Sequence, residues 1–354
     1  MRQVAGLKPK EYGSEYHWME FGESIDSACF DQGSLLFSTG RSALVSLLRH
    51  GMRDFQWKKV WMPQYFCPEV TRAVRDTGIN VGYYFDSPLD TPAIPADLGA
   101  GAVIFINNHF GLRNRSHYAA FYGVGVPIIE DHSHDPWSNW AKTSSADFAI
   151  ASYRKVLPIP DGAGLWSPRG NALCRCEGGE TARISEKLRA MLLKAAYLTG
   201  GWPEKEDYLT LYRHYAESLG SNCFRISGLS RNMLTAFPWE PWREQRKRNF
   251  GALQKNLPEN DRMLVMKPDD DSCVPYSFVL VFDTPARRER VRQSLFHRDI
   301  YPAVLWPITQ SFQGQIEDAV IRLSERMLSI HIDGRYTEED MRVIAAVVRR
   351  LFDQ

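Results

Sequence analysis

Short apolar runs alternate with longer amphipathic stretches through the first half of the chain. The runs are rich in valine, isoleucine and aromatic residues, which favours strands. The stretches between them repeat apolar residues at a helical spacing, which favours helices. These patterns predict strands over residues 59–62, 79–86, 101–106, 126–131 and 147–152, and helices over residues 41–52, 67–78 and 116–125.

Strands separated by helices are typical of βαβ units. We therefore expect an α/β fold in which helices cover both faces of a mostly parallel central sheet. Sheets of this kind bind ligands outside the carboxyl ends of their strands. Polar residues gather at three such ends, namely Asn107, Asn108 and His109 after the third strand, Asp131 at the end of the fourth, and Ser152, Arg154 and Lys155 after the fifth.

Beyond Pro168 the pattern becomes mainly helical and then breaks before a smaller C-terminal unit. The helical patterns cover residues 182–200, 207–220 and 228–257. Residues 257–275 carry clustered charges and prolines, which predict a loop or linker. Later patterns predict strands at 276–283, 300–307 and 327–332 and helices at 286–299 and 337–352. The predicted organisation is a large α/β domain over residues 1–257 and a small α+β domain over residues 258–354.

Charge and cysteine usage exclude several classes of partner. The chain has 43 lysine and arginine residues and 42 aspartate and glutamate residues. This balance gives no broad positive electrostatic field that would attract nucleic acid or an anionic membrane. The start of the chain lacks the apolar core of a signal peptide and no run approaches a membrane span, so we expect a cytoplasmic protein. Six scattered cysteines do not form a disulfide framework, and the spacing of Cys174 and Cys176 is wrong for structural zinc, so no metal is expected.

The segment Thr39-Gly40-Arg41 begins the first predicted helix. Free backbone N–H groups and the positive end of the helix dipole favour an anion such as phosphate at this position. Serine and threonine are also common helix N-caps, so a purely structural role is the alternative.

An acidic residue, Asp131, closes the apolar strand 126–131. It could cap the next helix. It could instead hold a protonated pyridine nitrogen, as pyridoxal 5′-phosphate (PLP) requires if its ring is to act as an electron sink. His134, three residues later, could hydrogen-bond such a cofactor or satisfy a local polar contact.

The segment Ser152-Tyr153-Arg154-Lys155 follows the next predicted strand. Lys155 lies where a Schiff-base amine would be needed, and Ser152 could reach the same phosphate. Arg154 would help to keep the amine deprotonated by like-charge repulsion. An ordinary strand end with solvated cations is the alternative, but the order of the three features favours a PLP site.

At these residues the chain resembles the DegT/StrS group of sugar aminotransferases, which are fold-type-I PLP enzymes. Several segments are similar to that group's motifs and occur in the same order. They are TGRSAL at 39–44, MPQYFCPEV at 62–70, NNHFG at 107–111, EDHSH at 130–134, SYRKVLPIPDGA at 152–163, CFRISGLSRNML at 223–234 and MLSIHIDGRYTEEDM at 327–341.

The resemblance implies a role for each matching residue. Lys155 and Asp131 would be catalytic, with Lys155 carrying PLP and Asp131 holding its pyridine nitrogen. Thr39, Gly40, Arg41 and Ser152 would bind the phosphate. The partner subunit's phosphate-binding asparagine of the group aligns with Cys223, beside Asn222, so we expect a homodimer.

Two positions depart from the group. His134 replaces a glutamine, and Cys67 stands where an aromatic residue usually covers the PLP ring. Tyr65 or Phe66 could take over this stacking, although aromatic residues at these positions could equally be buried in the core.

The expected reaction is transamination from a glutamate-like amino-acid donor to a keto acceptor, which the resemblance implies is a keto-sugar nucleotide. PLP chemistry of another kind, such as elimination, decarboxylation or C–C bond formation, is one alternative. A non-catalytic binding or regulatory subunit is the other, because fold alone does not fix function. Arg225 and Arg335 are candidates for binding a substrate carboxylate.

Overall fold

The central element is a seven-stranded sheet with strand order β2-β8-β7-β6-β5-β3-β4. The computed structural model describes residues 10–20, 33–173, 179, 184–220, 222–309 and 316–352. Strands β3 to β7 are parallel, whereas β8 runs antiparallel to both of its neighbours. The strands are β2 (Leu35–Phe37), β3 (Lys59–Pro63), β4 (Asn80–Tyr84), β5 (Ala102–Asn107), β6 (Ile128–Asp131), β7 (Phe148–Ala151) and β8 (Ala163–Trp166).

Both faces of this sheet are covered, which explains its nearly continuous apolar strands. On one face, Phe105 and Ile129 pack in the same core as Leu44 of α1 (Gly40–Asp54). On the other face, Ile104 and Ile128 pack with residues of the 3-10 helix η2 (Arg115–Gly123) and of α3 (Asn139–Lys142). Neighbouring residues of a strand thus face opposite layers, as the two-residue period of a strand requires.

Most of the predicted elements of this half are confirmed, but β2 and α3 were not predicted and two segments differ from the expectation. The segment 116–125, expected as an α-helix, forms η2 with a break in the helical backbone at Tyr118. The Gly/Pro-rich segment after Lys155 contains β8, which folds back on β7. Helix α2 (Pro68–Arg75) begins with a proline, whose fixed φ suits the first helical turn.

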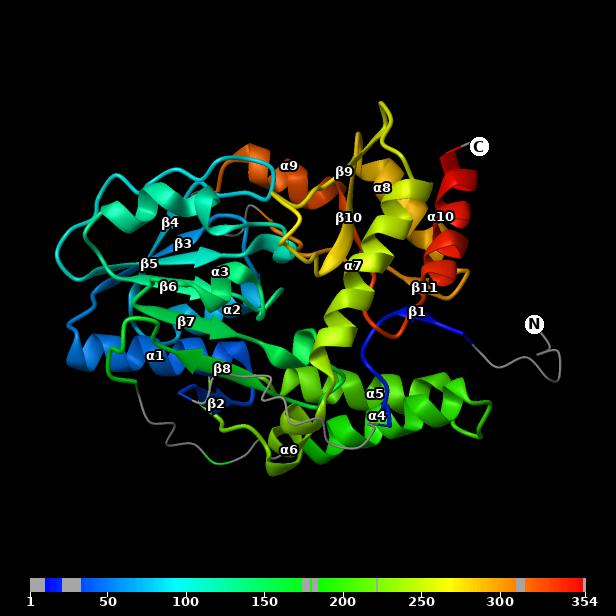
Figure 1. The fold of residues 1–354 in the computed structure, drawn as a ribbon, viewed down its shortest axis with the longest axis horizontal. Coiled ribbons are helices and arrows are strands. Elements are labelled where there is room, and N and C mark those ends of the chain that lie inside the picture. Colours follow the sequence, from blue (N-terminus) through cyan, green and yellow to red (C-terminus); the bar gives the residue numbers. More distant parts are fainter. Residues whose placement is uncertain are drawn as a thin grey trace.

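Four helices follow, α4 (Ile184–Leu198), α5 (Lys205–Glu217), α6 (Gly228–Ala236) and α7 (Trp239–Asn256). The predicted helix 228–257 is divided because Phe237 has an extended backbone and Pro238 precedes α7. Helices α4 and α5 pack as a hairpin, and Figure 1 shows them beneath the C-terminal part of the molecule.

The C-terminal part contains an antiparallel sheet of order β12-β10-β9. Its β9 (Met263–Val265) lies within residues 257–275, so the prediction of a loop was wrong there. Helix α9 (Asp318–Arg326) was not predicted. The remaining elements are β10 (Ser277–Phe282), α8 (Pro285–Phe296), β11 (Ile300–Tyr301), β12 (Met327–His331) and α10 (Glu338–Phe352).

The two parts share contacts at three places. The short strand β1 (Tyr12–Gly13) pairs with β11, so the N-terminal segment lies against the C-terminal part. Helix α7 extends from one part to the other, because its Trp242 packs with Leu157 whereas its Phe250 and Leu253 pack in the C-terminal core. Val279 and Met327 reach the core beneath α1. The boundary at residue 257 stays a prediction, whereas the fold class, a mostly parallel α/β sheet with a smaller α+β part, is confirmed.

Candidate active site

A cavity of about 160 Å³ lies where the carboxyl ends of β6 and β7 meet the first turn of α1. It brings together seven of the ten predicted cofactor-binding residues, which come from four separate segments. These seven are Thr39, Gly40, Arg41, Phe66, Asp131, Ser152 and Lys155.

The first turn of α1 forms one wall of this cavity. Thr39 caps the helix, because its side chain accepts a hydrogen bond from the Ser42 amide at 3.0 Å. The structural alternative therefore holds for the Thr39 side chain. A Cβ built on Gly40 would lie 3.4 Å from Ser152 Cβ and 3.5 Å from Ser133 Oγ. The absence of a side chain at Gly40 thus leaves space between these two serines, beside amides that lack helical partners.

Arg41 lines the cavity, but its guanidinium is engaged elsewhere. Its Nη2 forms an ion pair with Glu69 at 2.7 Å, and its Nη1 donates to the Leu219 carbonyl. The backbone of Arg41, in the first turn of α1, is therefore better suited to an anion than its side chain is.

Asp131 is the last residue of β6 and only 6% exposed. Its Oδ1 accepts a hydrogen bond from the Ser133 amide at 2.8 Å, which orients the carboxylate. This contact forms a tight turn after the strand and not the N-cap of a helix, so the alternative of a helix cap does not apply. Asp131 presents a buried carboxylate to the cavity, as a bound pyridinium would require.

Lys155 ends η3 (Tyr153–Lys155), directly after β7, and lines the same cavity. Burial lowers the pKa of its amine below the ordinary 10.5, because the charged form loses solvation. Asp131 and Cys67 act in the opposite direction, and Arg154 and Arg41 lower the pKa further. The expected effect of Arg154 is thus present, although burial is the larger cause.

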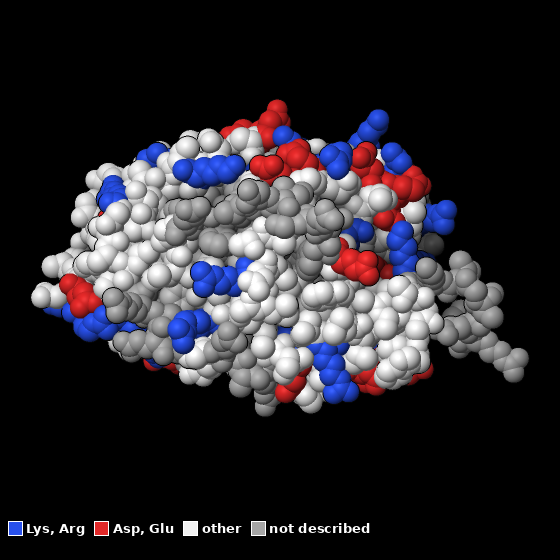
Figure 2. Space-filling view, turned by 60° about the horizontal axis from the view of Figure 1, so that its bottom comes forward, with Lys and Arg blue, Asp and Glu red and all other residues white. Residues whose placement is uncertain are grey.

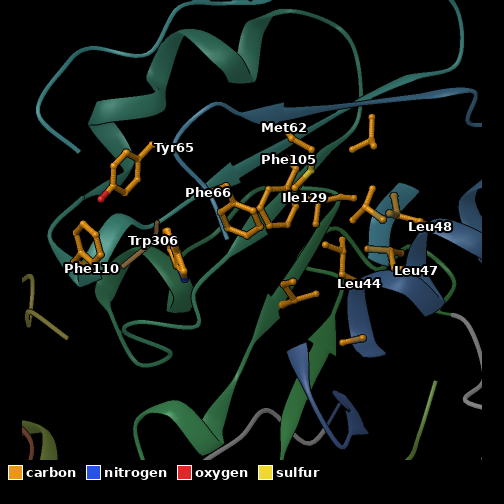
Figure 3. Close-up of a cluster of buried hydrophobic side chains, with 14 of the residues drawn as sticks. Leu44, Leu47, Leu48, Met62, Tyr65, Phe66, Phe105, Phe110, Ile129 and Trp306 are labelled. Carbon is orange, nitrogen blue, oxygen red and sulfur yellow. The ribbon is translucent and has the colours of Figure 1, made fainter. Parts of the chain in front are cut away.

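Of the two aromatic residues expected to stack on the cofactor, Phe66 lines the cavity and Tyr65 does not. Phe66 and Trp306 line the cavity, with ring centroids 5.6 Å apart. Tyr65 does not line it: its hydroxyl donates to the Leu305 carbonyl at 2.7 Å and its ring is fully buried. Figure 3 shows the Tyr65 hydroxyl turned away from Phe66. The core role left open for Tyr65 fits this placement, and Phe66 is the better candidate for stacking on a cofactor.

His134 lies outside the lining of this cavity, within a group of nearly parallel rings. It stacks on Tyr276 at 4.7 Å and on Trp306 at 5.8 Å between ring centroids. Its Nδ1 accepts a hydrogen bond from the Phe110 amide at 3.0 Å, which satisfies a local polar contact. Burial and the nearby Lys155 hold its pKa well below the usual range, so the ring is neutral at pH 7.

Asn222 is exposed and does not line the cavity of its own chain. Its carbonyl accepts a hydrogen bond from the Ser42 hydroxyl at 2.9 Å, which places the segment close to the first turn of α1. The expected role of Asn222 in the partner's site stays a prediction.

A second, larger cavity of about 390 Å³ adjoins the first. Arg154 and Lys155 line both cavities, so Lys155 lies between them. The N-terminal segment closes part of the larger one, and Tyr16 donates to the Lys155 carbonyl at 3.3 Å. Its other lining residues include three from the C-terminal part and one from α7, namely His331, Asp333, Arg335 and Arg246.

Among the residues that line the smaller cavity and were not predicted, Ser133 and Trp306 are the ones best suited to contact a cofactor. Ser133 could have been found, because it lies in the turn after Asp131, where a hydroxyl faces the same sheet edge as Ser152. Trp306 carried no usable signal, since it comes from the C-terminal part and reaches the cavity only through the tertiary fold.

Solved structures with this fold include several aminotransferases. PseC of Helicobacter pylori, an aminotransferase involved in the biosynthesis of pseudoaminic acid, superposes with a TM-score of 0.68 at 12% identity, covering 97% of this chain and 100% of that one. TlmJ of Streptoalloteichus hindustanus superposes with a TM-score of 0.65 at 14% identity, covering 91% of this chain and 86% of that one. A DegT DnrJ EryC1 StrS aminotransferase of Brucella abortus superposes with a TM-score of 0.59 at 15% identity, covering 90% of this chain and 85% of that one.

The chain has the fold of these aminotransferases. The resemblance to the DegT/StrS group is thereby confirmed at the level of the fold. No protein-family model matches the sequence, and no curated protein matches it either.

Two further features of the described residues concern membranes and metals. They contain no helix that is both long and apolar enough to cross a membrane. Within the same residues, no group of histidine, cysteine, aspartate or glutamate side chains is arranged to hold a metal ion. Cys174 and Cys176 lie outside the described residues.

Proposed function

We propose that the protein is a PLP-dependent aminotransferase that moves an amino group from an amino-acid donor to a keto acceptor. One observation carries the proposal: a single cavity is lined by Lys155, Asp131, Ser152 and the first turn of α1. An amine, a carboxylate and an anion site in one enclosed space match the three polar parts of PLP.

The residues present fit the cofactor. Asp131 would hold the pyridine nitrogen, and Ser133, Ser152 and the amide of Gly40 would hold the phosphate. Phe66 and Trp306 offer aromatic surface for the ring. When bound, PLP supplies an electron sink that stabilises negative charge on the Cα atom of an amino acid.

Lys155 is the group that moves the proton. Its Nζ would hold the cofactor until an amino acid takes its place, and the freed amine would then accept the Cα proton and deliver it to C4′ of the cofactor. A general base must be unprotonated at the working pH, and the buried surroundings of Lys155 lower its pKa in that direction. Asp131 would meanwhile keep the pyridine nitrogen protonated, which maintains the electron sink.

The larger cavity would hold the substrates, because Lys155 lines it whereas the residues of the anion site, Gly40 and Ser152, do not. The donor we propose is glutamate-like, and the acceptor is a keto-sugar nucleotide or a related biosynthetic intermediate. Two further solved structures with this fold support this class of acceptor, the sugar aminotransferase CalS13 of Micromonospora echinospora and DesI in the presence of its TDP-sugar product.

We also propose that the active form is a homodimer. Exposed apolar side chains occur on α4, on α6 and in the loop between α4 and α5, with Trp202 81% exposed, Leu192 46% and Leu229 39%. Figure 2 shows a broad uncharged area right of its centre, on the side that carries the lower part of Figure 1. Sedimentation should give a dimer, and a fully active monomer would contradict this proposal.

The test of the cofactor assignment is the Lys155→Ala variant. Wild-type protein supplied with PLP should carry a yellow chromophore that borohydride fixes covalently, and peptide mapping should place the label on Lys155. The variant should stay folded and lose the borohydride-fixed label. Lys142→Ala, on the exposed end of α3, is the matched control and should keep it. A fixed label in the Lys155 variant, or no PLP binding by the wild type, would refute the assignment.

A further inference from the structure

Arg246 of α7 is a buried arginine in the wall of the larger cavity, which it shares with Lys155. The residue is 1% exposed. Its Nη1 donates to the His134 carbonyl at 3.2 Å. Its Nη2, by contrast, has no hydrogen-bond partner within the described part of the chain.

An unpaired buried guanidinium is costly, because its charge loses solvation without compensation. The carboxylates that line the same cavity are already engaged. The carboxylate of Asp333 accepts hydrogen bonds from Nε and Nη2 of Arg335 at 2.7 and 2.8 Å. Glu15 forms an ion pair with Lys187. Among the described residues no ion pair includes Arg246, so the missing partner is an anion that the chain itself does not provide.

Arg243, one turn earlier on α7, differs from Arg246 in having a carboxylate partner. Its Nε and Nη2 bind both oxygens of the buried Asp135 at 2.9 and 2.8 Å. The fold therefore supplies a carboxylate for Arg243, which does not line the larger cavity, but no carboxylate for Arg246, which does.

We propose that Arg246 binds a carboxylate of the amino-acid donor in the larger cavity, an inference that rests on the aminotransferase function proposed above. A guanidinium recognises a carboxylate through charge and directed N–H donors. Arg246 and Lys155 line one space, so a donor held there would have its carboxylate at Arg246 and its amine toward Lys155.

The two arginines suggested by the sequence are less suitable. Arg335 is occupied by Asp333 and also donates to the Ser14 and Glu15 carbonyls. Arg225 is exposed and lines neither cavity.

Arg154 adds positive charge to the same space. It lines both cavities, and its Nε lacks a hydrogen-bond partner in the residues described. Together with Arg246 it favours a donor with two carboxylates over one with a neutral side chain. Glutamate and its keto acid 2-oxoglutarate are therefore the probes of choice.

The experiment compares PLP-loaded wild type with Arg246→Gln, Arg246→Lys and the control Arg248→Gln. Arg248 lies on the same helix with its side chain 52% exposed, so its loss should leave binding unchanged. Calorimetric titration with 2-oxoglutarate should show binding weakened about ten- to a hundredfold in Arg246→Gln, the range expected for hydrogen bonds between charged groups. The affinity of Arg246→Lys, which keeps the charge, should lie between those of the wild type and Arg246→Gln.

Amide analogues distinguish contact from a structural effect. Apparent affinities for glutamate, glutamine and isoglutamine, in which each carboxylate in turn is replaced by a neutral amide, are obtained from the concentration dependence of the spectral change that each causes. In the wild type, loss of the carboxylate that contacts Arg246 should weaken binding, and in Arg246→Gln that penalty should disappear. A merely structural role would instead weaken all three ligands equally, which would overturn the proposal.

The remaining outcomes are also decisive. Wild-type affinity for 2-oxoglutarate in Arg246→Gln, or no binding by the wild type, would overturn the inference. If Arg246→Gln fails to fold in thermal unfolding, Arg246→Lys decides: affinity lowered several-fold supports the inference, and unchanged affinity overturns it. A wild type that binds glutamate through Arg246 without transferring its nitrogen would refute the aminotransferase function and leave the carboxylate site in place.

Discussion

Asp131 and Lys155 lie on the wall of one cavity because β6 and β7 are adjacent parallel strands. Asp131 ends β6, and Lys155 ends the 3-10 helix that follows β7. The carboxylate raises the pKa of the Lys155 amine, while burial, the larger effect, lowers it. The amine that would carry the cofactor and the carboxylate that would hold its ring thus also influence each other directly.

Replacing Asp131 should impair catalysis more than folding. In Asp131→Asn the neutral amide can still accept from the Ser133 amide but no longer favours a protonated pyridine nitrogen, so the rate of amino transfer from glutamate should fall at least about tenfold. Stopped-flow absorbance measures the rate. Asp97→Asn, at a carboxylate 78% exposed on the surface, is the control. A wild-type rate in Asp131→Asn would show that Asp131 does not hold the pyridine.

The sequence predicted those parts of the site that depend on local order along the chain. Asp131, Ser152 and Lys155 each follow a recognisable strand, and parallel strands place their carboxyl ends at one edge. Trp306 could not be predicted, because its position depends on how the C-terminal part packs against the sheet. Strand β8 was hidden because Gly164 lies within it and Pro160 and Gly162 directly precede it, and only pairing with β7 and β2 stabilises its extended form.

Tyr65 and Arg246 show a second limit of sequence reasoning. Neighbouring residues of a loop can point to opposite sides, and no periodicity indicates that Phe66 lines the cavity while Tyr65 is buried. Arg246 lies on a helix with several arginines and lysines, and its sequence position resembles that of its exposed neighbours. Only the tertiary structure shows that this one is buried.

Gly40→Ala should separate cofactor binding from stability. The added Cβ would make ordinary contacts of 3.4 to 3.9 Å with Ser152 and Ser133, and alanine favours a helix more than glycine does. We expect an unchanged or slightly higher melting temperature, together with weaker PLP binding because the methyl group occupies the space for the phosphate. Fluorescence titration of PLP and thermal unfolding measure the two effects. Unchanged PLP affinity would place the phosphate elsewhere.

The pKa of Lys155 should respond to its two charged neighbours in opposite directions. In Arg154→Gln the loss of a like charge should raise the pKa, although burial should keep it below 10.5, and in Asp131→Asn the loss of an opposite charge should lower it. The measurement is the rate at which an amine-reactive reagent modifies Lys155 in cofactor-free protein as the pH rises, followed by mass spectrometry. Identical midpoints in all three proteins would contradict this electrostatic account.

The central claim is that an amino donor leaves its nitrogen on the cofactor, and a single half-reaction tests it. Purified PLP-loaded protein is mixed with glutamate, without any acceptor, and the absorption spectrum and the released small molecules are followed. We predict loss of the yellow chromophore, with pyridoxamine phosphate and 2-oxoglutarate formed in equal amounts. The Lys155→Ala variant should give neither product. A chromophore that persists with every amino donor, while some amino acid is nevertheless converted to product, would contradict transamination and favour another PLP reaction.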